Sequence, residues 1–380
     1  MANNNENKIL NVPNLRFPEF SGEWVTKSIN DLAVVIGGGT PDTTVKSYWD
    51  GEIQWFTPSE IGKNKYVDSS LRTITEVGLN NSSAKLLPPN TILLSSRATI
   101  GECSLSLREC ATNQGFQCLV SKKCNVDFLY YLIQTKKKDL IRKSCGSTFL
   151  EISANEVRKI QVSVPSDVEQ QKIAELLSLI DERIATQNKI IEDLKKLKSA
   201  ISERLFKSVK GSTVLLSDLC DIVKGKQING ENLSDSGNYY VMNGGTEPSG
   251  YYDNYNVEAS TISISEGGNS CGYVQFNTSP FWSGGHCYSI QNIADKVDNM
   301  YLYHYLKSNE DAIMKLRIGS GLPNIQKKDL AMFKIIVPKI EWQIKISTFL
   351  SSLERKAEIE ERIQNVMQKQ KLYLLQQMFI

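Results

Sequence analysis

The sequence predicts an α+β protein with two mostly β domains in a pseudo-twofold repeat, separated by two long antiparallel coiled-coil helices. Three observations carry this prediction. The chain aligns with itself at a fixed offset of 173 in the numbering, as between Pro165 and Pro338. Each copy contains short β-type runs, and each copy ends in a long heptad pattern. A length of 380 residues accommodates two or three domains.

The repeat holds its register without a gap from Leu129 to the C-terminus. Several identical residues recur at the offset of 173: Gly146 with Gly319, Ile152 with Ile325, Val164 with Val337, Gln170 with Gln343, and Phe206 with Phe379. Upstream, "INDLAVVIGGG" at Ile29 resembles "LSDLCDIVKGK" at Leu216 with an offset of 187. The first copy is therefore longer by about 14 residues before the shared part.

The long helices follow from heptad spacing. From Val168 to Phe206 the apolar seam comprises Ile173, Leu177, Ile180, Ile184, Ile191, Leu194, Ile201 and Leu205, with Gln187 and Lys198 filling two places. The second seam comprises Ile346, Leu350, Leu353, Ala357, Met367, Leu374 and Met378, with polar Glu360, Gln364 and Lys371. Each helix of roughly 39 residues would measure about 58 Å. The two apolar stripes bury each other, and the polar seam residues fix the register.

The start of the first long helix carries a capping signal. Ser166 follows Pro165 as an expected N-cap, and Glu169 stands three residues later, which is the spacing of a capping box. The remaining segments are short β-type runs bounded by Gly, Pro, Asn and Ser, such as "IQWFTP", "NTILLSSRATIG", "STISISEGGNSCGYVQF" and "FKIIVP". Each half is therefore expected to be a compact β domain with a small helix, followed by its long helix.

These patterns set the expected domain boundaries. We expect an N-terminal arm at 1–20, a first mostly β domain at 21–152, a central helical region at 153–207, a second mostly β domain at 208–325 and a C-terminal helical region at 326–380.

Composition excludes several classes of protein. The chain is 41% hydrophobic and 23% charged, and no apolar run reaches the roughly 18 residues of a membrane span. The start "MANNNENKIL" has no signal-peptide character, so we expect a cytoplasmic protein. The eight cysteines form no C-x-x-C pair, which favours free, mostly buried thiols over a zinc ribbon. The basic segment Lys136–Lys143 fits a solvated helix face as well as it fits a phosphate contact.

No catalytic motif is present in the sequence. There is no G-x-S-x-G elbow and no G-x-x-x-x-G-K-[ST] phosphate loop. Of the two histidines, His304 lies in an aromatic helical segment and is expected to be ordinary packing, whereas His286 in "SGGHCYSI" has no metal-type partner. The glycine-rich "IGGGTP" at Ile36 predicts a turn where the backbone passes close to a partner chain or a phosphate. We therefore expect neither a metal nor a cofactor in this chain.

Polar loops remain as the candidates for function. Arg and Asn side chains present donors and acceptors to base edges, and glycine permits close approach, so these loops suit DNA recognition. The alternative is that Gly and Asn only form tight turns. The candidate DNA-binding residues are Lys63, Lys65, Ser96, Arg97, Thr99, Asn113, Gln114, Lys224, Lys226, Asn243, Thr246, Asn269, Ser270 and His286.

At this point the chain resembles the specificity subunits of type I restriction–modification systems over nearly its whole length. "VPNLRFPEFSGEW" is similar to the family's N-terminal lead-in, and "IGGGTP" with "IQWFTPSEI" resembles the opening of its target recognition domains. "ATNQGFQCL" and "PFWSGGHCYSI" resemble its central strands, and "VPSDVEQQKIAELLSLID" is close to its most specific motif. The second copy of that motif, "VPKIEWQIKISTFLSSLE", departs at Trp342 and Ile344, where the family more often has glutamate and glutamine.

The resemblance implies a subunit that reads double-stranded DNA and does no chemistry itself. Each target recognition domain would read one half of a bipartite site, and the paired helices would act as a ruler. It also implies two methyltransferase subunits that use S-adenosylmethionine for adenine methylation, together with ATP-driven, magnesium-dependent restriction subunits. The chain itself would thus take part in DNA methylation and restriction only as a component of a larger complex.

The outer faces of the long helices carry more apolar residues than a two-helix seam needs. We expect these residues to dock partner subunits: Ile190, Leu197, Val366, Leu372 and Leu375. A different class of function stays open, namely a non-catalytic coiled-coil adaptor whose β domains bind proteins. The net charge of +2 favours that alternative, because DNA-binding surfaces usually make a chain more basic.

Overall fold

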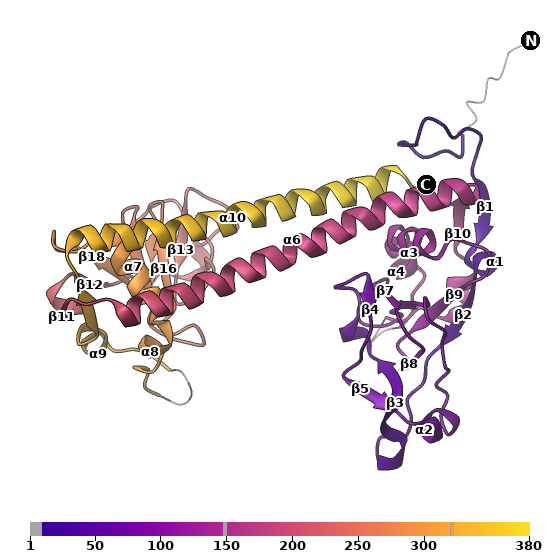
Figure 1. The fold of residues 1–380 in the computed structure, drawn as a ribbon, viewed down its shortest axis with the longest axis horizontal. Helices are drawn as coiled ribbons and strands as arrows, with labels where there is room; N and C mark the ends of the chain where they lie inside the picture. The colour runs from indigo at the N-terminus through magenta and orange to yellow at the C-terminus, as the bar shows by residue number, and fades with distance from the viewer. Residues whose placement is uncertain (1–9, 147–149, 320, 322) are drawn as a thin grey trace, which may run out of the picture. The chain divides into compact units, whose positions relative to one another are not determined.

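The computed structural model describes residues 10–146, 150–319, 321 and 323–380 (Figure 1). The chain divides into two compact units. Unit 1 comprises Met1–Asn188 and Ile363–Ile380, and unit 2 comprises Lys189–Arg362. Two long helices, α6 (Asp167–Ser208) and α10 (Ile340–Gln377), each contribute one part to either unit. The expected α+β class, with β domains and long helices, is confirmed.

Unit 1 is built on a five-stranded sheet of order β2-β9-β6-β7-β4 and a three-stranded sheet of order β5-β3-β8, while β1 pairs with β10. Its strands are β1 (Val25–Ser28), β2 (Ala33–Gly37), β3 (Trp49–Phe56), β4 (Tyr66–Val67), β5 (Arg72–Ile74), β6 (Ile92–Leu94), β7 (Cys103–Ser106), β8 (Cys110–Thr112), β9 (Gln117–Ser121) and β10 (Gln161–Val164). Its short helices are α1 (Ile29–Leu32), α2 (Glu76–Asn80), α3 (Val126–Thr135), α4 (Lys137–Arg142) and α5 (Ala154–Arg158).

Unit 2 repeats this plan with a four-stranded sheet of order β12-β18-β15-β16 and a three-stranded sheet of order β14-β13-β17, while β11 pairs with β19. Its strands are β11 (Ser212–Leu215), β12 (Asp221–Lys224), β13 (Tyr239–Met242), β14 (Tyr251–Tyr252), β15 (Thr261–Ser265), β16 (Val274–Asn277), β17 (Trp282–Ser283), β18 (Cys287–Gln291) and β19 (Lys334–Val337). Its short helices are α7 (Asn299–Ser308), α8 (Glu310–Met314) and α9 (Lys327–Ala331).

The offsets read from the sequence reappear in the structure. The first residues of helices α3, α5 and α6 correspond to those of α7, α9 and α10 at the offset of 173, and β10 corresponds to β19 at the same offset. Strand β1 corresponds to β11 at the offset of 187, as the weaker upstream match predicts. The repeat is therefore a repeat of secondary structure and of strand pairing, not only of composition.

The repeated glutamine fastens each long helix to its domain. Gln170 is 2% exposed, and its side chain donates to the Pro165 carbonyl at 3.0 Å and accepts from the Asn125 amide at 3.0 Å. Gln343 is fully buried and makes the same pair of bonds, to the carbonyl of Pro338 and from the amide of Asp298, each at 2.9 Å. Because Asn125 and Asp298 are the N-caps of α3 and α7, one amide joins the starts of two helices in each unit.

The heptad seams lie where the sequence places them. Every seam residue is buried or half-buried, including Gln187, Lys198, Gln364 and Lys371. Within unit 1, Lys371 of α10 pairs with Asp181 of α6 at 2.6 Å. Within unit 2, Lys198 of α6 pairs with Glu354 of α10 at 2.6 Å. In each unit, an early part of one helix thus packs on a late part of the other, so the helices are antiparallel.

Each unit has its own hydrophobic core. In unit 1 the core joins the main sheet and α3 to the long-helix residues Ile173, Leu177 and Phe379. In unit 2 it joins the main sheet and α7 to Phe206, Ile346 and Leu350. The eight cysteines are free, and all but Cys145 are buried, as expected. Burial raises the pKa of the Cys110 thiol to about 11, which keeps it protonated and unreactive.

Candidate nucleic-acid interface

Each unit contains a tight backbone crossing, which we call the corner. In unit 1 the Gly39 amide donates to the carbonyl of Thr112 at 2.8 Å, and in unit 2 the Lys226 amide donates to that of Ser283 at 2.8 Å. A Cβ atom at Gly38 would lie within 3.0 Å of the carbonyl oxygens of Thr112 and Asn113. The glycine-rich turn therefore approaches the chain's own backbone, and its approach to a partner chain or a phosphate at Ile36–Pro41 stays a prediction.

The same crossing in unit 2 depends on Gly225. A Cβ atom there would lie within 3.0 Å of the carbonyl oxygens of Ser283 and Gly284. Gly38 and Gly225 correspond to each other at 187, the offset of the upstream repeat. The corner is thus one backbone device built twice, and the loops that leave it carry most of the predicted contact residues.

In unit 1 the structure brings four candidates around the corner. Arg97 and Thr99 lie on the loop after β6, and Asn113 and Gln114 lie on the loop between β8 and β9. The two loops meet because the Ser96 amide donates to the Gly115 carbonyl at 2.8 Å. Gln114 and Thr99 are exposed, and the Gln114 side chain accepts from Thr40.

The two half-buried candidates of unit 1 already have partners inside the chain. The Arg97 guanidinium pairs with Glu151 at 2.7 Å, with 42% of the Arg97 side chain exposed. The Asn113 side chain accepts from the Gly115 amide at 2.8 Å and so shapes its own turn. Arg97 thus retains donors that face solvent, whereas Asn113 uses its carbonyl oxygen within the loop.

Of the other predicted contact residues in unit 1, two are buried and one is exposed. Lys65 is wrong as a surface contact, because its side chain is only 6% exposed, pairs with Asp127 at 2.6 Å and donates to Ser178 at 2.7 Å. Ser96 is wrong for the same reason, since it is fully buried. Lys63 is exposed and lines a hollow of about 230 Å³ with Lys65, Tyr130 and Asp181.

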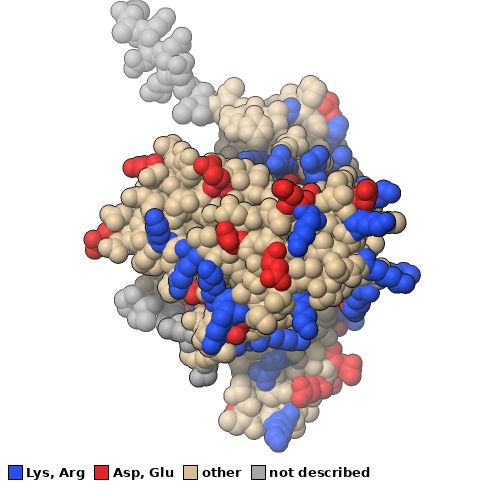
Figure 2. Space-filling model, turned by 90° about the vertical axis from the view of Figure 1, so that its left-hand side faces the viewer, with Lys and Arg blue, Asp and Glu red and all other residues tan. Residues whose placement is uncertain are grey.

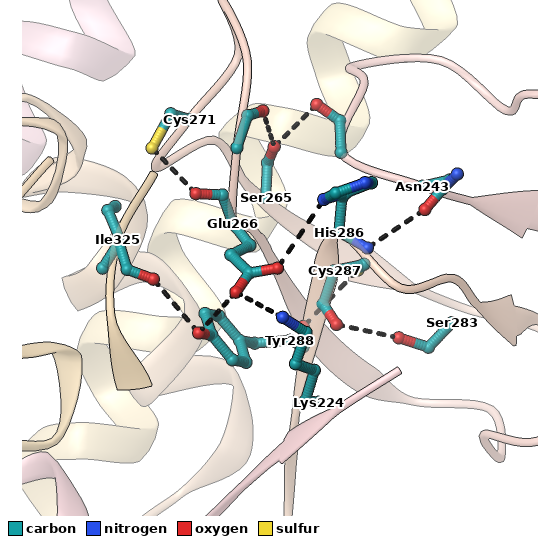
Figure 3. Close-up of polar contacts among 12 residues, drawn as sticks. Lys224, Asn243, Ser265, Glu266, Cys271, Ser283, His286, Cys287, Tyr288 and Ile325 are labelled. Carbon is teal, nitrogen blue, oxygen red and sulfur yellow. Dashed lines mark hydrogen bonds and ion pairs between the residues drawn. The ribbon is translucent and has the colours of Figure 1, made fainter. Parts of the chain in front are cut away.

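In unit 2 the corner holds a polar cluster of Lys224, Asn243, Glu266, His286 and Tyr288, which we call the corner cluster (Figure 3). Lys224 donates to Glu266 Oε1 at 2.7 Å, and His286 Nδ1 lies 3.8 Å from Glu266 Oε2. The His286 amide donates to Asn243 Oδ1 at 3.0 Å. Three predicted residues, Lys224, Asn243 and His286, are therefore neighbours in space although they are distant in sequence.

The other candidates of unit 2 lie on nearby turns. Lys226, Thr246 and Asn269 are exposed, and Ser270 is half-buried. Gly268 has a φ of +77°, a backbone conformation that glycine adopts most easily, and it turns the loop that presents Asn269 and Ser270. The exposed polar groups of this loop are thus available to a partner.

Two residues of the corner cluster were missed by sequence reasoning. Glu266 is 5% exposed and Tyr288 is 2% exposed, and the Tyr288 hydroxyl lies 3.0 Å from Glu266 Oε1. Burial, together with the neighbouring Glu266, raises the pKa of Tyr288 well above its usual value. The signal that was available is Glu266 itself, a carboxylate placed directly after the apolar strand run "TISIS", where a buried charge needs partners.

His304 is ordinary packing, as predicted. The residue is 2% exposed, and its Nε2 atom lies 2.9 Å from the Ser351 hydroxyl. Burial lowers the pKa of His304 to about 4, so the ring is neutral near pH 7.

The outer helix faces carry exposed apolar side chains. Ile190, Leu197, Val366 and Leu372 are 40–59% exposed. Leu375 is wrong as a docking residue, because it is 8% exposed and belongs to the core of unit 1. Sequence reasoning missed further exposed apolar residues on the same helices: Val168, Leu179, Phe349, Ile359, Ile363 and Tyr373.

Surface charge and metal-type clusters do not point to a further binding site in the described part of the chain. On the face seen in Figure 2, lysine and arginine side chains lie among acidic ones. Within the described part of the chain there is no group of three His, Cys, Asp or Glu residues arranged to hold a metal ion. The helices in that part also lack a stretch long and apolar enough to cross a membrane.

Comparison with known proteins identifies the family. The family described as "Type I restriction modification DNA specificity domain" matches residues 21–196 and again 210–369. The chain is 39% identical over 180 residues to the type I restriction enzyme MjaIX specificity subunit of Methanocaldococcus jannaschii, an alignment that covers 46% of this chain and 42% of the relative. It is 25% identical over 367 residues to the EcoprrI specificity subunit of Escherichia coli, covering 87% of each chain.

Solved structures show the same fold. The S subunit of a type I restriction–modification system from M. genitalium superposes with a TM-score of 0.64 at 18% identity, covering 97% of this chain and 99% of the other. Two matches to one domain family, spanning most of the chain, define a protein with a duplicated specificity domain. The chain belongs to the type I restriction modification DNA specificity domain family.

Proposed function

We propose that this protein is the sequence-specific DNA-binding specificity subunit of a type I restriction–modification complex. Each β domain reads one half of a bipartite site in double-stranded DNA. The observation that carries the proposal is the pair of corners, which have the same glycine crossing but different side chains around it. Two readers with one backbone plan and unlike chemistry suit two unlike half-sites.

The repeat also suits the geometry of DNA. Half-sites read from the same side of the duplex lie about one helical turn, roughly 34 Å, apart. A helix of 42 residues and one of 38 residues connect the two readers and would set that separation. Register between the helices rests on specific pairs such as Lys198 with Glu354, which supports a fixed spacer rather than a flexible linker.

The proposed partners are two methyltransferase subunits, together with restriction subunits that act as motor and nuclease. We propose that the methyltransferase subunits dock on the exposed apolar residues of the helices, namely Ile190, Leu197, Val366 and Leu372. In this proposal the chain has no catalytic activity of its own. S-adenosylmethionine, ATP and magnesium belong to the partners, and the complex works in the cytoplasm, where the DNA lies.

The near-neutral net charge of the chain is compatible with DNA binding if the partner subunits supply positively charged surface. The contacts that we propose to the DNA are those that the structure leaves at the surface: Lys63, Arg97, Thr99, Asn113, Gln114, Lys224, Lys226, Asn243, Thr246, Asn269, Ser270 and His286. Arg97 and Gln114 would act in the first reader, and Lys226 and Asn269 in the second.

The direct test is methylome sequencing of cells with and without the gene. Deletion is expected to remove adenine methylation from a single bipartite motif and to leave other modified sites unchanged. An unchanged methylome in cells that express the methyltransferase partner would contradict the proposal. A coiled-coil adaptor that binds only proteins would give that unchanged result.

Two altered chains test whether the readers and the ruler act separately. Replacing residues 211–322 with the corresponding part of a relative is expected to change one half of the methylated motif only. Removing one heptad from both long helices together is expected to shorten the unread spacer and to keep both half-sites. A motif changed in both halves by the replacement, or an unaltered spacer after the deletion, would show that the readers or the ruler do not work independently.

A further inference from the structure

The corner cluster of unit 2 holds a buried carboxylate with one oxygen satisfied and one not. The Glu266 side chain is 7% exposed. Its Oε1 atom accepts from Lys224 Nζ at 2.7 Å and lies 3.0 Å from the hydroxyl of Tyr288. Among the described residues, its Oε2 atom has no hydrogen-bond donor within reach. A buried carboxylate oxygen without a donor is costly, so Oε2 is the atom of the cluster that is left open to a further donor.

His286 is the side chain placed to complete that contact. Its Nδ1 atom lies 3.8 Å from Glu266 Oε2, which is slightly too long for a hydrogen bond, and 63% of its side chain is exposed (Figure 3). The backbone around it is fixed, because its amide donates to Asn243 and its Cβ packs against Gly244, which has a φ of +86°. The ring can therefore close on the carboxylate while its main chain stays in place.

The equivalent place in unit 1 has none of this chemistry. The Ile152 amide donates to the carbonyl of Ser96 and the Ile325 amide donates to that of Glu266, so Ser96 stands where Glu266 stands. The Ser96 amide donates to Gly115, whereas the Glu266 amide donates to His286, so Gly115 stands where His286 stands. The acid and imidazole pair belongs to the second reader alone.

We infer that His286 is a specificity-determining residue of the second reader and that Glu266 is its positioning residue. This inference rests on the proposed function. Because an ionised carboxylate only accepts hydrogen bonds, Glu266 Oε2 holds the proton on Nδ1. In the neutral ring the outward Nε2 atom is then an acceptor, and its partner in DNA is an exocyclic amino group, adenine N6 or cytosine N4, in the major groove.

The test uses the assembled methyltransferase complex and a DNA library randomised across both half-sites. His286→Ala is expected to relax base preference about tenfold at one position of the half-site read by unit 2. Glu266→Gln is expected to relax the same position and to keep the other positions of that half-site. Glu258→Gln, which removes an exposed carboxylate elsewhere in unit 2, serves as the control and is expected to change nothing.

A second arm tests the chemical group. Once the position is known, its base is replaced by the analogue without the amino group, purine for adenine or 2-pyrimidinone for cytosine. The wild-type complex is expected to bind this DNA about tenfold more weakly, and His286→Ala to bind both DNAs equally. Equal losses in both proteins would overturn the amino-group assignment.

The outcomes separate this inference from the proposed function. One outcome is that the wild-type complex selects a bipartite site while both variants either select it unchanged or lose base preference equally at all positions. That result overturns the inference alone. A wild-type complex that selects no bipartite site overturns the proposed function as well. Because His286 is mostly exposed, its replacement does not threaten the fold, and the unaffected half-site reports that the complex is intact.

Discussion

The starts of the two long helices correspond in the repeat, but one is buried and the other is exposed. At the start of α6, Glu169 is 1% exposed, and its carboxylate accepts from Arg16 Nε and Nη2 at 2.7 Å each. The indole nitrogen of Trp24 lies 3.3 Å from the same carboxylate. At the equivalent place in α10, Trp342 is 59% exposed.

The difference follows from the N-terminal arm of unit 1. Residues 10–24 lie at the start of α6. The carboxylate of Glu169 at this end of the helix binds the guanidinium of Arg16 in the arm. At the start of α10 the Trp342 side chain is instead mostly exposed, and the Lys345 ammonium lies 5.0 Å from its ring. A repeat can thus keep its fold while one copy adapts to a neighbour that the other copy lacks. Whether Trp342 and Ile344 also treat a partner subunit differently remains a prediction.

The largest effect is expected where the two units agree most closely, at the corner glycines. Gly225→Ala puts a Cβ against two backbone carbonyls and is expected to destabilise unit 2 by roughly 4 kcal/mol or more. Gly38→Ala is expected to do the same to unit 1. Gly230→Ala is the matched control, since a Cβ there meets no atom within 4 Å. Hydrogen exchange resolved by unit measures the effect, and equal stability of Gly225→Ala and Gly230→Ala would contradict it.

The next effect tests the comparison of the helix entrances. Glu169→Ala leaves the Arg16 guanidinium without its carboxylate in a mostly buried place and is expected to destabilise unit 1 by about 3 kcal/mol. Trp342→Ala, at the equivalent position of unit 2, removes an exposed ring and is expected to change stability by less than about 0.5 kcal/mol. Urea unfolding checks both variants. A loss for Glu169→Ala as small as that expected for Trp342→Ala would mean that the arm does not depend on Glu169.

A third effect distinguishes the units by pH. His304 takes the place of Tyr131 at the offset of 173. Its pKa is lowered to about 4 in the folded chain, so the unfolded chain binds a proton first as the pH falls below roughly 6.5. Unit 2 is therefore expected to lose stability between about pH 6.5 and pH 4, on the order of 3 kcal/mol, and to lose little more from this group below that range. Comparing His304→Gln with wild type at pH 7 and pH 4.5 isolates the contribution, and an unchanged pH dependence would contradict it.

The smallest effect concerns the seam. Lys198→Ala removes a partly buried partner of Glu354 and is expected to cost about 1 kcal/mol. Lys196→Ala breaks the exposed pair with Glu192 on the outside of the same helix and is expected to cost less than about 0.5 kcal/mol. Thermal unfolding of the two variants under the same conditions gives the ranking, and the reverse order would mean that Lys198 does not fix the seam.

Much of the fold was predictable, because periodicity reports burial directly. The seam residues from Ile173 to Leu205 were assigned by spacing alone and are buried or half-buried. The capping box was predicted only in part. The Glu169 amide lies 3.4 Å from the Ser166 hydroxyl as expected, but the Glu169 carboxylate binds Arg16 instead of the N-cap amide. A local motif cannot reveal a partner so distant in the sequence.

The candidate site was predictable by residue type and not by environment. Arg97 and Asn243 stand in loops near the corners, as their neighbouring glycines indicated. Lys65 and Ser96 have the same polar character in the sequence, but the Lys65 side chain pairs with Asp127 of α3 and is 6% exposed, and Ser96 is fully buried. Composition identifies the polar loops, and only the packing decides which of their side chains face a partner.

The end of α10 makes unit 1 the later of the two units to be completed during synthesis. The Gln377 carbonyl accepts from the Leu15 amide at 2.8 Å, and the ring of Phe379 stacks on Phe128 with centroids 5.3 Å apart. These residues of unit 1 leave the ribosome only after the whole of unit 2 has been made, a delay of tens of seconds at about 5–20 residues per second. Until these residues emerge, unit 1 has an unfilled aromatic site between Trp24 and Phe128.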